Sequence, residues 1–503
     1  MSIPKISGIE TEFGIVARGL DINPMVASSL LVNAYSDDGL SLRVWDFLNE
    51  TPHLDARGAW DPSAEYPHVE SMMANAILTN GARYYVDHAH PEVSTPECAT
   101  PSEVVLYDRA AEMIISRSMT RASSRLRPGS ELVAYKNNSD GKGNSYGCHE
   151  NYLVERDVPF GRLQRHITPH FVSRQVFCGA GKVGSENRRE GEPEPVFQLS
   201  QRADFFEEEV GLETTIRRPI VNTRDEPHAD PSRFRRLHVI VGDANMSQVA
   251  TWLKVGSTAL VLACIEDDMF PAELVIADPV SEIRRVSHDT SMRHPVFLAG
   301  GRTIGALDMQ HEILGAVERW LTGVDDDCIG GESTSVLAEW HRVLDGLSTD
   351  PAKVADTVDW VAKRRIIDGF AERHGLAPTD GRLRAIDLQY HDMRPDKCLA
   401  TRAGLRTLCD DTHAERAMTN PPDSTRAYFR GRCVSMWPER IVSANWDGVV
   451  VDTTDGLVRI PMPDPTKGSR AHVKEILDDS RSVDDLLVAL SGSVERVEPD
   501  PGW

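Results

Sequence analysis

The segment near the N-terminus, residues 6–15, carries the pattern that most constrains the fold of this chain. Apolar residues such as Ile9 and Phe13 alternate there with Glu10 and Glu12. A period of two places successive side chains on opposite faces of a β-strand, so both carboxylates point the same way. The segment therefore predicts a sheet with one apolar face and one acidic face. A solvated sheet face is the simpler interpretation of the same pattern.

Three later segments, residues 82–87, 147–154 and 236–241, also read as strands. Together with the first strand they carry a set of polar residues: Glu10, Glu12, Tyr85, Asp87, Glu92, His149 and His238. Carboxylates and imidazoles gathered on one sheet face suit Mg²⁺ or Mn²⁺, which bridge phosphate oxygens. Taken singly, each histidine is also explained as a satisfied interior residue, and Asp87 as part of a turn.

Arginines are concentrated in two stretches. They are Arg202, Arg217, Arg218, Arg224, Arg235 and Arg236, followed by Arg426, Arg430 and Arg432. Planar guanidinium groups match carboxylates and phosphates, although surface arginines paired with acids are the common alternative. The acids and the arginines together predict ATP chemistry on a carboxyl or amide group.

The remaining pattern is mixed. Helices are expected at residues 102–120 and 247–265, and three amphipathic helices are expected between 307 and 374. Residues 36–71 are acidic, contain three prolines and show no sustained period. Such an insertion is typical of a loop or lid, and a tolerated surface excursion is the alternative.

Composition excludes some partners. Of 503 residues, 55 are Lys or Arg and 77 are Asp or Glu, which gives a net charge of -22. This charge repels nucleic acids and anionic membranes at long range, so we expect neither as a partner. The eight cysteines form no CxxC motif, and the longest apolar run, residues 258–265, is too short to span a bilayer. We therefore expect a cytoplasmic protein.

Five motifs together resemble the Pup ligase/depupylase family of carboxylate-amine ligases, which is related to glutamine synthetase. They are GIETEFGI (8–15), NGARYYVD (80–87), HPE (90–92), GCHENY (147–152) and RLHVIVGDAN (236–245). The likeness covers nearly the whole chain. It implies an α+β fold with a curved antiparallel sheet backed by helices. It also implies a catalytic domain at residues 1–430, with a flexible insertion at about 36–71, and a small C-terminal domain at 431–503.

Within the family, the sequence is more similar to the branch that hydrolyses amides than to the ligases. The acidic insertion and the motif YVDHAHPE at residues 85–92 distinguish this branch from the ligases. The resemblance implies an ATP- and Mg-dependent enzyme that deamidates the C-terminal Gln of the small protein Pup. It also implies cleavage of the isopeptide bond between Pup and lysines of pupylated proteins. The alternative is a ligase that joins Pup to lysines with ATP hydrolysis.

The resemblance also implies roles for individual residues. Asp87 matches the catalytic aspartate. Glu10, Tyr85 and Glu92 match magnesium ligands, and Glu12, His149 and His238 are further candidates for metal or phosphate contacts. The implied contacts to ATP, or to ADP plus phosphate, are Arg83, Thr95, Trp446 and Arg430, and those to the Pup terminus are Arg202 and Arg224. Asp87 is expected to act either as a general base on water or as a nucleophile.

Overall fold

The computed structural model describes residues 2–36, 41–42, 45–47, 50–52, 54–58, 74–186, 194–324, 327–490 and 494–496. Most of the predicted insertion at residues 36–71 lies outside the described residues. The short described pieces of that insertion contact both the central sheet and the C-terminal segment, as set out below.

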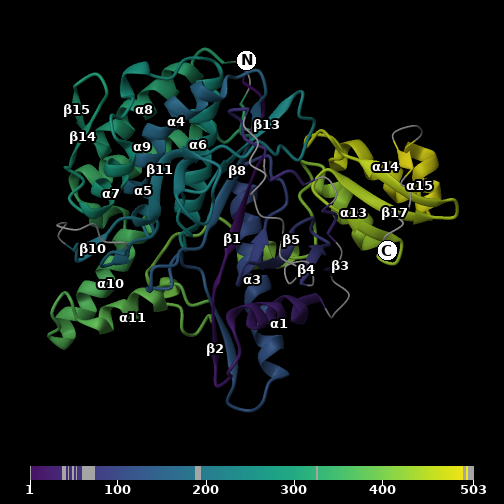
Figure 1. Ribbon diagram of the computed structural model, residues 1–503, viewed down its shortest axis with the longest axis horizontal. Coiled ribbons are helices and arrows are strands. Elements are labelled where there is room, and N and C mark those ends of the chain that lie inside the picture. Colours follow the sequence, from purple (N-terminus) through teal and green to yellow (C-terminus); the bar gives the residue numbers. More distant parts are fainter. Residues whose placement is uncertain are drawn as a thin grey trace.

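A sheet of seven antiparallel strands forms the centre of the molecule (Figure 1). In spatial order the strands are β13 (Phe234–Val239), β8 (Cys148–Glu155), β1 (Ser7–Glu12), β6 (His90–Ser94), β5 (Arg83–Asp87), β4 (Asn75–Leu78) and β3 (Ser41–Leu42). All three later strands that the sequence predicts are present. The alternation of side chains leaves one sheet face apolar and the other polar.

The first predicted strand is two strands in the structure. β1 ends at Glu12, and β2 (Gly14–Arg18) pairs instead with β7 (Glu131–Tyr135) in a separate two-stranded sheet. The chain changes partner next to Gly14, where a Cβ atom would lie 2.4 Å from the hydroxyl of Tyr146. The prediction of one continuous strand was therefore wrong. A period of two persists across such a break and does not reveal it.

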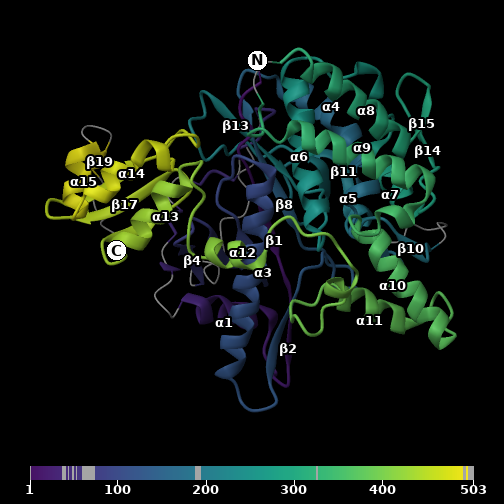
Figure 2. The same cartoon turned by 180° about the vertical axis from the view of Figure 1, so that it is seen from behind.

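Three helices cover the apolar face of the central sheet. α1 (Pro24–Ser36) contacts β5 and β6, α3 (Pro101–Ser124) contacts β1, and α6 (Gln248–Glu266) contacts β8 (Figures 1 and 2). Side chains of the strands, such as Ile9 and Val93, join the main hydrophobic cluster there. α6 is long and apolar enough to cross a membrane, but 94% of its apolar window is buried inside the protein, as expected for a core helix.

Most of the remaining helices of the large part of the chain pack around α6 or against helices that do, whereas the last one packs against α3 (Figures 1 and 2). They are α4 (Phe160–Ser173), α5 (Gln175–Cys178), α7 (Pro279–His288), α8 (Ala306–Leu321), α9 (Ser333–Thr349), α10 (Asp359–His374), α11 (Gly381–Tyr390) and α12 (Asp411–Ala417). The three amphipathic helices predicted between residues 307 and 374 are confirmed as α8, α9 and α10. α10 ends at His374 and is followed by Gly375, whose φ of 61° suits a left-handed helix cap.

Short strands and 3₁₀ turns complete this part. The strand pairs are β9 (Lys182–Val183) with β10 (Phe197–Gln198), β11 (Phe206–Gly211) with β12 (Arg218–Asn222), and β14 (Pro295–Phe297) with β15 (Thr303–Gly305). The 3₁₀ turns are η1 (Ala203–Phe205), η2 (Ala272–Leu274), η3 (Pro351–Val354) and η4 (Ala400–Arg402). β12 leads directly into β13 and so places the intervening loop, residues 223–233, beside the polar sheet face.

The C-terminal segment forms a second sheet with its own hydrophobic cluster, which also includes Trp45 and Ile77 (Figure 1, yellow). Its elements are α13 (Ala427–Met436), β16 (Ile441–Ala444), β17 (Gly448–Thr453), β18 (Gly456–Pro461), α14 (Arg470–Asp479), α15 (Val483–Leu490) and β19 (Glu495–Arg496). A separate cluster is typical of a domain. The boundary between residues 430 and 431 stays a prediction.

Candidate active site

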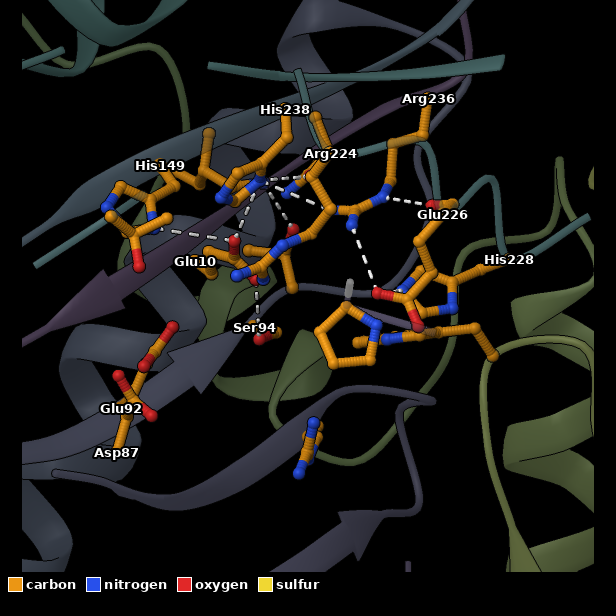
Figure 3. Close-up of a pocket in the computed structure, with 18 of the residues that line it drawn as sticks. Glu10, Asp87, Glu92, Ser94, His149, Arg224, Glu226, His228, Arg236 and His238 are labelled. Carbon is orange, nitrogen blue, oxygen red and sulfur yellow. Dashed lines mark hydrogen bonds and ion pairs between the residues drawn. The ribbon is translucent and has the colours of Figure 1, made fainter. Parts of the chain in front are cut away.

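A cavity of about 490 Å³ lies on the polar face of the central sheet, between the sheet, the loop after β12 and the C-terminal segment (Figure 3). Most of the site residues expected from the sequence line it: Glu10, Arg83, Tyr85, Asp87, Glu92, Thr95, His149, Arg224, His238 and Trp446. A concave site with a few convergent polar groups is typical of ligand binding. The cavity is therefore the candidate active site.

Strand register brings the acidic residues together. Glu10 lies opposite His149 on β8 and opposite Ser94 on β6, while Glu12 lies opposite Glu92. Glu92 in turn lies opposite Tyr85 on β5. Directly opposed residues of antiparallel strands share a face, so these side chains form rows across the sheet.

The first candidate metal cluster is Glu10 with His149 and His238. The Glu10 carboxylate lies 3.6 Å from Nδ1 of His149 and 3.4 Å from Nδ1 of His238. Burial alone raises the pKa of Glu10, but the hydrogen bond with His149, together with the nearby Arg236 charge, lowers the pKa below its usual range. Burial lowers the pKa of His238, which keeps its imidazole neutral and able to donate a lone pair to a cation.

The second candidate cluster is Glu12 with Asp87 and Glu92. One ligand atom from each residue lies within 4.8 Å of the others. Burial raises the pKa of Glu92 well above its usual range, and the charges of Asp87, Glu10 and Glu12 raise it further. For Glu12, burial is outweighed by contact with His90, which lowers the pKa to about 2. Carboxylates crowded in this way favour a divalent cation, because its charge relieves their repulsion.

Tyr85 contributes to this cluster in a different way. Burial and the Glu92 charge raise the pKa of its phenol well above the usual value, so the hydroxyl stays protonated. It lies beside Glu92 and 3.4 Å from the Ser94 hydroxyl. A neutral phenol is a weaker ligand for Mg²⁺ than a carboxylate. The geometry favours Tyr85 as a hydrogen-bonding neighbour of Glu92.

Aromatic groups occupy the other end of the cavity. The Arg83 guanidinium lies between the rings of Trp45 and Tyr85, at 4.1 and 3.9 Å from their centroids. Trp446 contacts Trp45 edge to face, with 5.2 Å between centroids. The Thr95 hydroxyl accepts a hydrogen bond from the Ile9 amide at 3.0 Å. Flat aromatic and guanidinium surfaces of this kind suit stacking against a nucleobase.

The loop between β12 and β13 adds polar groups to the same cavity. Arg224 lies there with its Nε atom buried and without a hydrogen-bond partner among the described residues. A buried, unpaired guanidinium nitrogen points to an anionic ligand, because an unsatisfied donor is costly. The donors of Arg236 are instead directed to Asn151, Glu226 and His238 (Figure 3).

Three residues expected in the site do not line the cavity: Glu12, which lies in the second cluster, and two arginines. Arg430 is fully buried and donates to Gly81, to Glu97 and to the backbone of Trp446, so its donors are used within the protein. Arg202 is also buried and donates to the backbone of Tyr146. Burial and the nearby Arg218 charge lower the pKa of Arg202 to about 10. The Nε atom of Arg202 has no hydrogen-bond partner among the described residues.

Other cavity residues were not singled out from the sequence. They are Glu50, Ser94, Glu97, Asn151, Glu226 and His228, whereas Arg236 and Arg426, which also line the cavity, belong to the arginines expected from the sequence. Most lie in loops, or at strand ends, without a periodic signal. His228 has a φ of 47°, an unusual backbone conformation for a side chain other than glycine, which no sequence pattern indicates.

Comparisons with known proteins agree with this geometry. The model of the Pup-ligase protein family matches residues 5–450. The chain is 48% identical to a depupylase of Acidothermus cellulolyticus and 43% identical to a Pup deamidase/depupylase of Mycolicibacterium smegmatis. Each match covers 97% of this chain and 99% of the relative. A Pup–protein ligase of Kineococcus radiotolerans is 40% identical, over 80% of this chain and 90% of the relative.

Two solved structures are also similar. One is the complex between the prokaryotic ubiquitin-like protein Pup and its ligase PafA, with a TM-score of 0.79, 31% identity and coverage of 94% of this chain and 92% of that chain. The other is PafA in complex with ADP, with a TM-score of 0.73, 34% identity and coverage of 80% and 89%. The expected α+β, glutamine-synthetase-like fold is confirmed, and the chain belongs to the Pup-ligase family.

Proposed function

We propose that this chain is an amide hydrolase that acts on Pup. It converts the C-terminal Gln of Pup into Glu, and it cleaves the isopeptide bond between Pup and the lysines of pupylated proteins. Both reactions break a bond at the same δ-carbonyl carbon, so one site serves both. Pup and pupylated proteins are the partners.

One observation carries this proposal: relatives named for depupylation match 97% of the chain, from end to end of their own sequences. The match with the ligase is shorter, at 80% of the chain. The described pieces of the insertion also line the cavity through Glu50 and Pro52. These findings favour the hydrolase over the ligase alternative.

The cavity has the donors for a nucleotide and for Mg²⁺. Glu10 and Glu92, which line the cavity, and Glu12, in the cluster beside them, are carboxylate ligands of the type that Mg²⁺ prefers, and His149 and His238 complete the first cluster. Arg83, Thr95 and Trp446 suit the nucleoside, and the orphaned Nε of Arg224 suits an anion. When bound, Mg²⁺ and nucleotide phosphates supply positive charge and fixed oxygens near the reacting amide. Amide hydrolysis itself needs no energy from ATP, so the nucleotide acts as a cofactor.

Asp87 is the residue that acts on the amide. An amide carbonyl is a poor electrophile, so the enzyme must supply an activated nucleophile and stabilise the oxyanion. Asp87 lies at the end of β5, beside Glu92 and facing the cavity (Figure 3). Its carboxylate either removes a proton from water, which then attacks the carbonyl, or attacks the carbonyl itself to give a transient anhydride that water hydrolyses. In both cases the C–N bond breaks and the nitrogen leaves, protonated, as ammonia or as the lysine amine. Among the cavity arginines, we assign Arg224, whose Nε has no described partner, to stabilise the oxyanion or hold the Pup terminus.

Replacing Asp87 by Asn tests this proposal. The variant keeps the size of the side chain but loses the basic carboxylate, so deamidation and depupylation should both be abolished while nucleotide binding persists. The assay incubates the protein with Pup ending in Gln, ATP and Mg²⁺, and follows the mass change from Gln to Glu. Asp268→Asn, at an exposed aspartate outside the cavity, is the matched control. Turnover by Asp87→Asn would remove Asp87 from the mechanism.

We further propose a cytoplasmic location. All eight cysteines lie among the described residues, and each is a free thiol. Seven of them are buried. Unpaired cysteines throughout a chain are typical of reducing compartments.

A further inference from the structure

The turn between β5 and β6 holds an unusual residue next to Asp87. Asp87 pairs with His90 in the antiparallel ladder, so His88 and Ala89 alone form the connection. His88 has a φ of 51°. Two-residue hairpin turns with positive φ at the first position favour glycine, because a Cβ atom is strained there. A histidine with positive φ at residue 88 therefore indicates a functional role for its side chain.

The imidazole of His88 contacts the Asp87 carboxylate. Nδ1 of His88 lies 2.9 Å from Oδ2 of Asp87. An ionised carboxylate only accepts hydrogen bonds, so the ring nitrogen must carry the hydrogen and donate it. The donor fixes one oxygen of Asp87 and so restricts rotation of the whole carboxylate.

The surroundings explain why Asp87 needs such a donor. Its carboxylate lies in a cluster with those of Glu12 and Glu92, and like charges repel one another. The side chain of Asp87 is 40% exposed, so packing does not hold it in place. His88 supplies the hydrogen bond that holds Asp87 against this repulsion.

The backbone of the turn is held separately. The hydroxyl of Ser28 on α1 donates to the carbonyl oxygen of Ala89 at 2.8 Å, and Ser28 is fully buried. The turn is also closed by the pairing of Asp87 with His90. The side chain of His88 can therefore be removed without loss of these backbone contacts.

We propose that His88 is a positioning residue that holds the Asp87 carboxylate in its reactive orientation. This inference rests on the proposed function, because it takes Asp87 as the group that acts on the amide. His88 accepts a strained backbone conformation, where glycine would be easier, in order to present its ring to Asp87. The general principle is that a reactive group displaced by about 1 Å loses on the order of 100-fold in rate.

His88→Gly is the main test, because glycine suits the positive φ and the variant should fold at least as well as the parent. We expect kcat for both deamidation and depupylation to fall by about 10- to 100-fold. KM for Pup and the affinity for ATP should be unchanged, and Tm should not fall. Because the His88 ring is 45% exposed, added imidazole should reach the vacated position and restore part of the rate.

Two further variants sharpen the test. His88→Asn keeps a side-chain donor and tolerates positive φ, so it should retain more activity than His88→Gly. Asp268→Gly changes another residue with positive φ, 59°, outside the cavity, and should leave both activities unchanged.

The outcomes separate this inference from the function it rests on. Full turnover by His88→Gly would overturn the role of His88 while leaving Asp87 in place. A rise in KM for Pup at unchanged kcat would also overturn it, because His88 would then bind substrate. If His88→Gly lost activity, added imidazole did not restore it and His88→Asn were no more active, His88 would have only a structural role. Failure of the parent protein to deamidate Pup, or turnover by Asp87→Asn, would instead contradict the proposed function.

Discussion

Glu92 and Glu97 lie close together in the sequence, and both are largely buried, yet their surroundings are opposite. Glu97 sits between the guanidinium groups of Arg426 and Arg430. Burial raises its pKa, but the charges of Arg430 and Arg426 outweigh burial and lower the pKa to about 2. Glu97 therefore has its counter-charges within the chain, and it links the large sheet to the C-terminal segment.

Glu92 has no such partner among the described residues. Burial raises its pKa, and neighbouring carboxylates raise it further. A buried carboxylate is stable only when it is paired or protonated, so Glu92 depends on a charge from outside the chain. Burial of an acidic side chain therefore does not by itself identify a binding site. The source of the balancing charge separates a structural carboxylate from a binding one.

The largest expected effect comes from breaking the Glu97 cluster. Glu97→Ala leaves Arg426 and Arg430 buried without a carboxylate, which should lower the free energy of unfolding by about 3 kcal/mol. Glu97→Gln keeps oxygen and nitrogen atoms in place and should lose less. Equilibrium unfolding in urea measures both, and an unchanged midpoint for Glu97→Ala would contradict the structural role.

Magnesium should stabilise the protein through Glu92. At a concentration 100 times its Kd, a ligand that binds only the folded state adds about 2.7 kcal/mol. Glu92→Gln should lose most of this gain, and Glu415→Gln, an exposed acid outside the cavity, should keep it. Thermal unfolding with and without Mg²⁺ provides the measurement. An equal shift in Tm for both variants would show that the cation binds elsewhere.

Acid should affect the two glutamates in opposite directions. The pKa of Glu97 is lowered from 4.5 to about 2, so its contribution to stability is present above pH 4.5 and is lost as the pH falls towards 2. Glu97→Gln should remove this part of the acid sensitivity. The stability that the parent loses on acidification should be smaller than the stability that Glu97→Ala loses, because a protonated Glu97 carboxyl still accepts hydrogen bonds.

For Glu92 the sign is reversed. Its raised pKa gives stability that is present below pH 4.5 and is lost as the pH rises through the folded-state pKa. Without Mg²⁺, Glu92→Gln should therefore gain stability over the parent at neutral pH. Unfolding free energies measured across pH without divalent cations test this, and a variant less stable than the parent at pH 7 would contradict it.

The smallest effect is expected at an exposed ion pair. Arg117 on α3 lies 3.2 Å from Glu415 on α12, and both side chains are partly in solvent. Solvent screens such pairs, so Arg117→Ala should change the free energy of unfolding by less than about 1 kcal/mol. If Arg117→Ala lowered the free energy of unfolding as much as Glu97→Ala does, burial would not explain the difference between exposed and buried ion pairs.

Much of the site could be predicted because its signals are local. Alternation in four strands placed Glu10, Tyr85, Asp87 and His149 on a polar face, and helix periodicity located α6, α8, α9 and α10. The break between β1 and β2 could not be predicted, because it depends on the close approach of Gly14 to Tyr146, a residue distant in sequence.

The arginines show the same limit more clearly. Arg224, Arg236 and Arg430 cannot be distinguished in the sequence. In the structure, Arg224 has a buried Nε without a described partner, and Arg236 donates hydrogen bonds to its neighbours in the cavity. Arg430 instead donates to Glu97. The contribution of the loop at residues 226–228 to the cavity also had no local signal.

The polar and apolar faces of the strands and the family motifs can be recognised in the amino-acid sequence alone, because each pattern lies within a few consecutive residues. Three contacts arise only in the folded protein: Glu12 lies opposite Glu92, Glu97 pairs with two arginines, and the His88 ring contacts Asp87. The physical reason is that electrostatic pairing depends on strand register and on the geometry of turns, and both are set by contacts between distant parts of the chain.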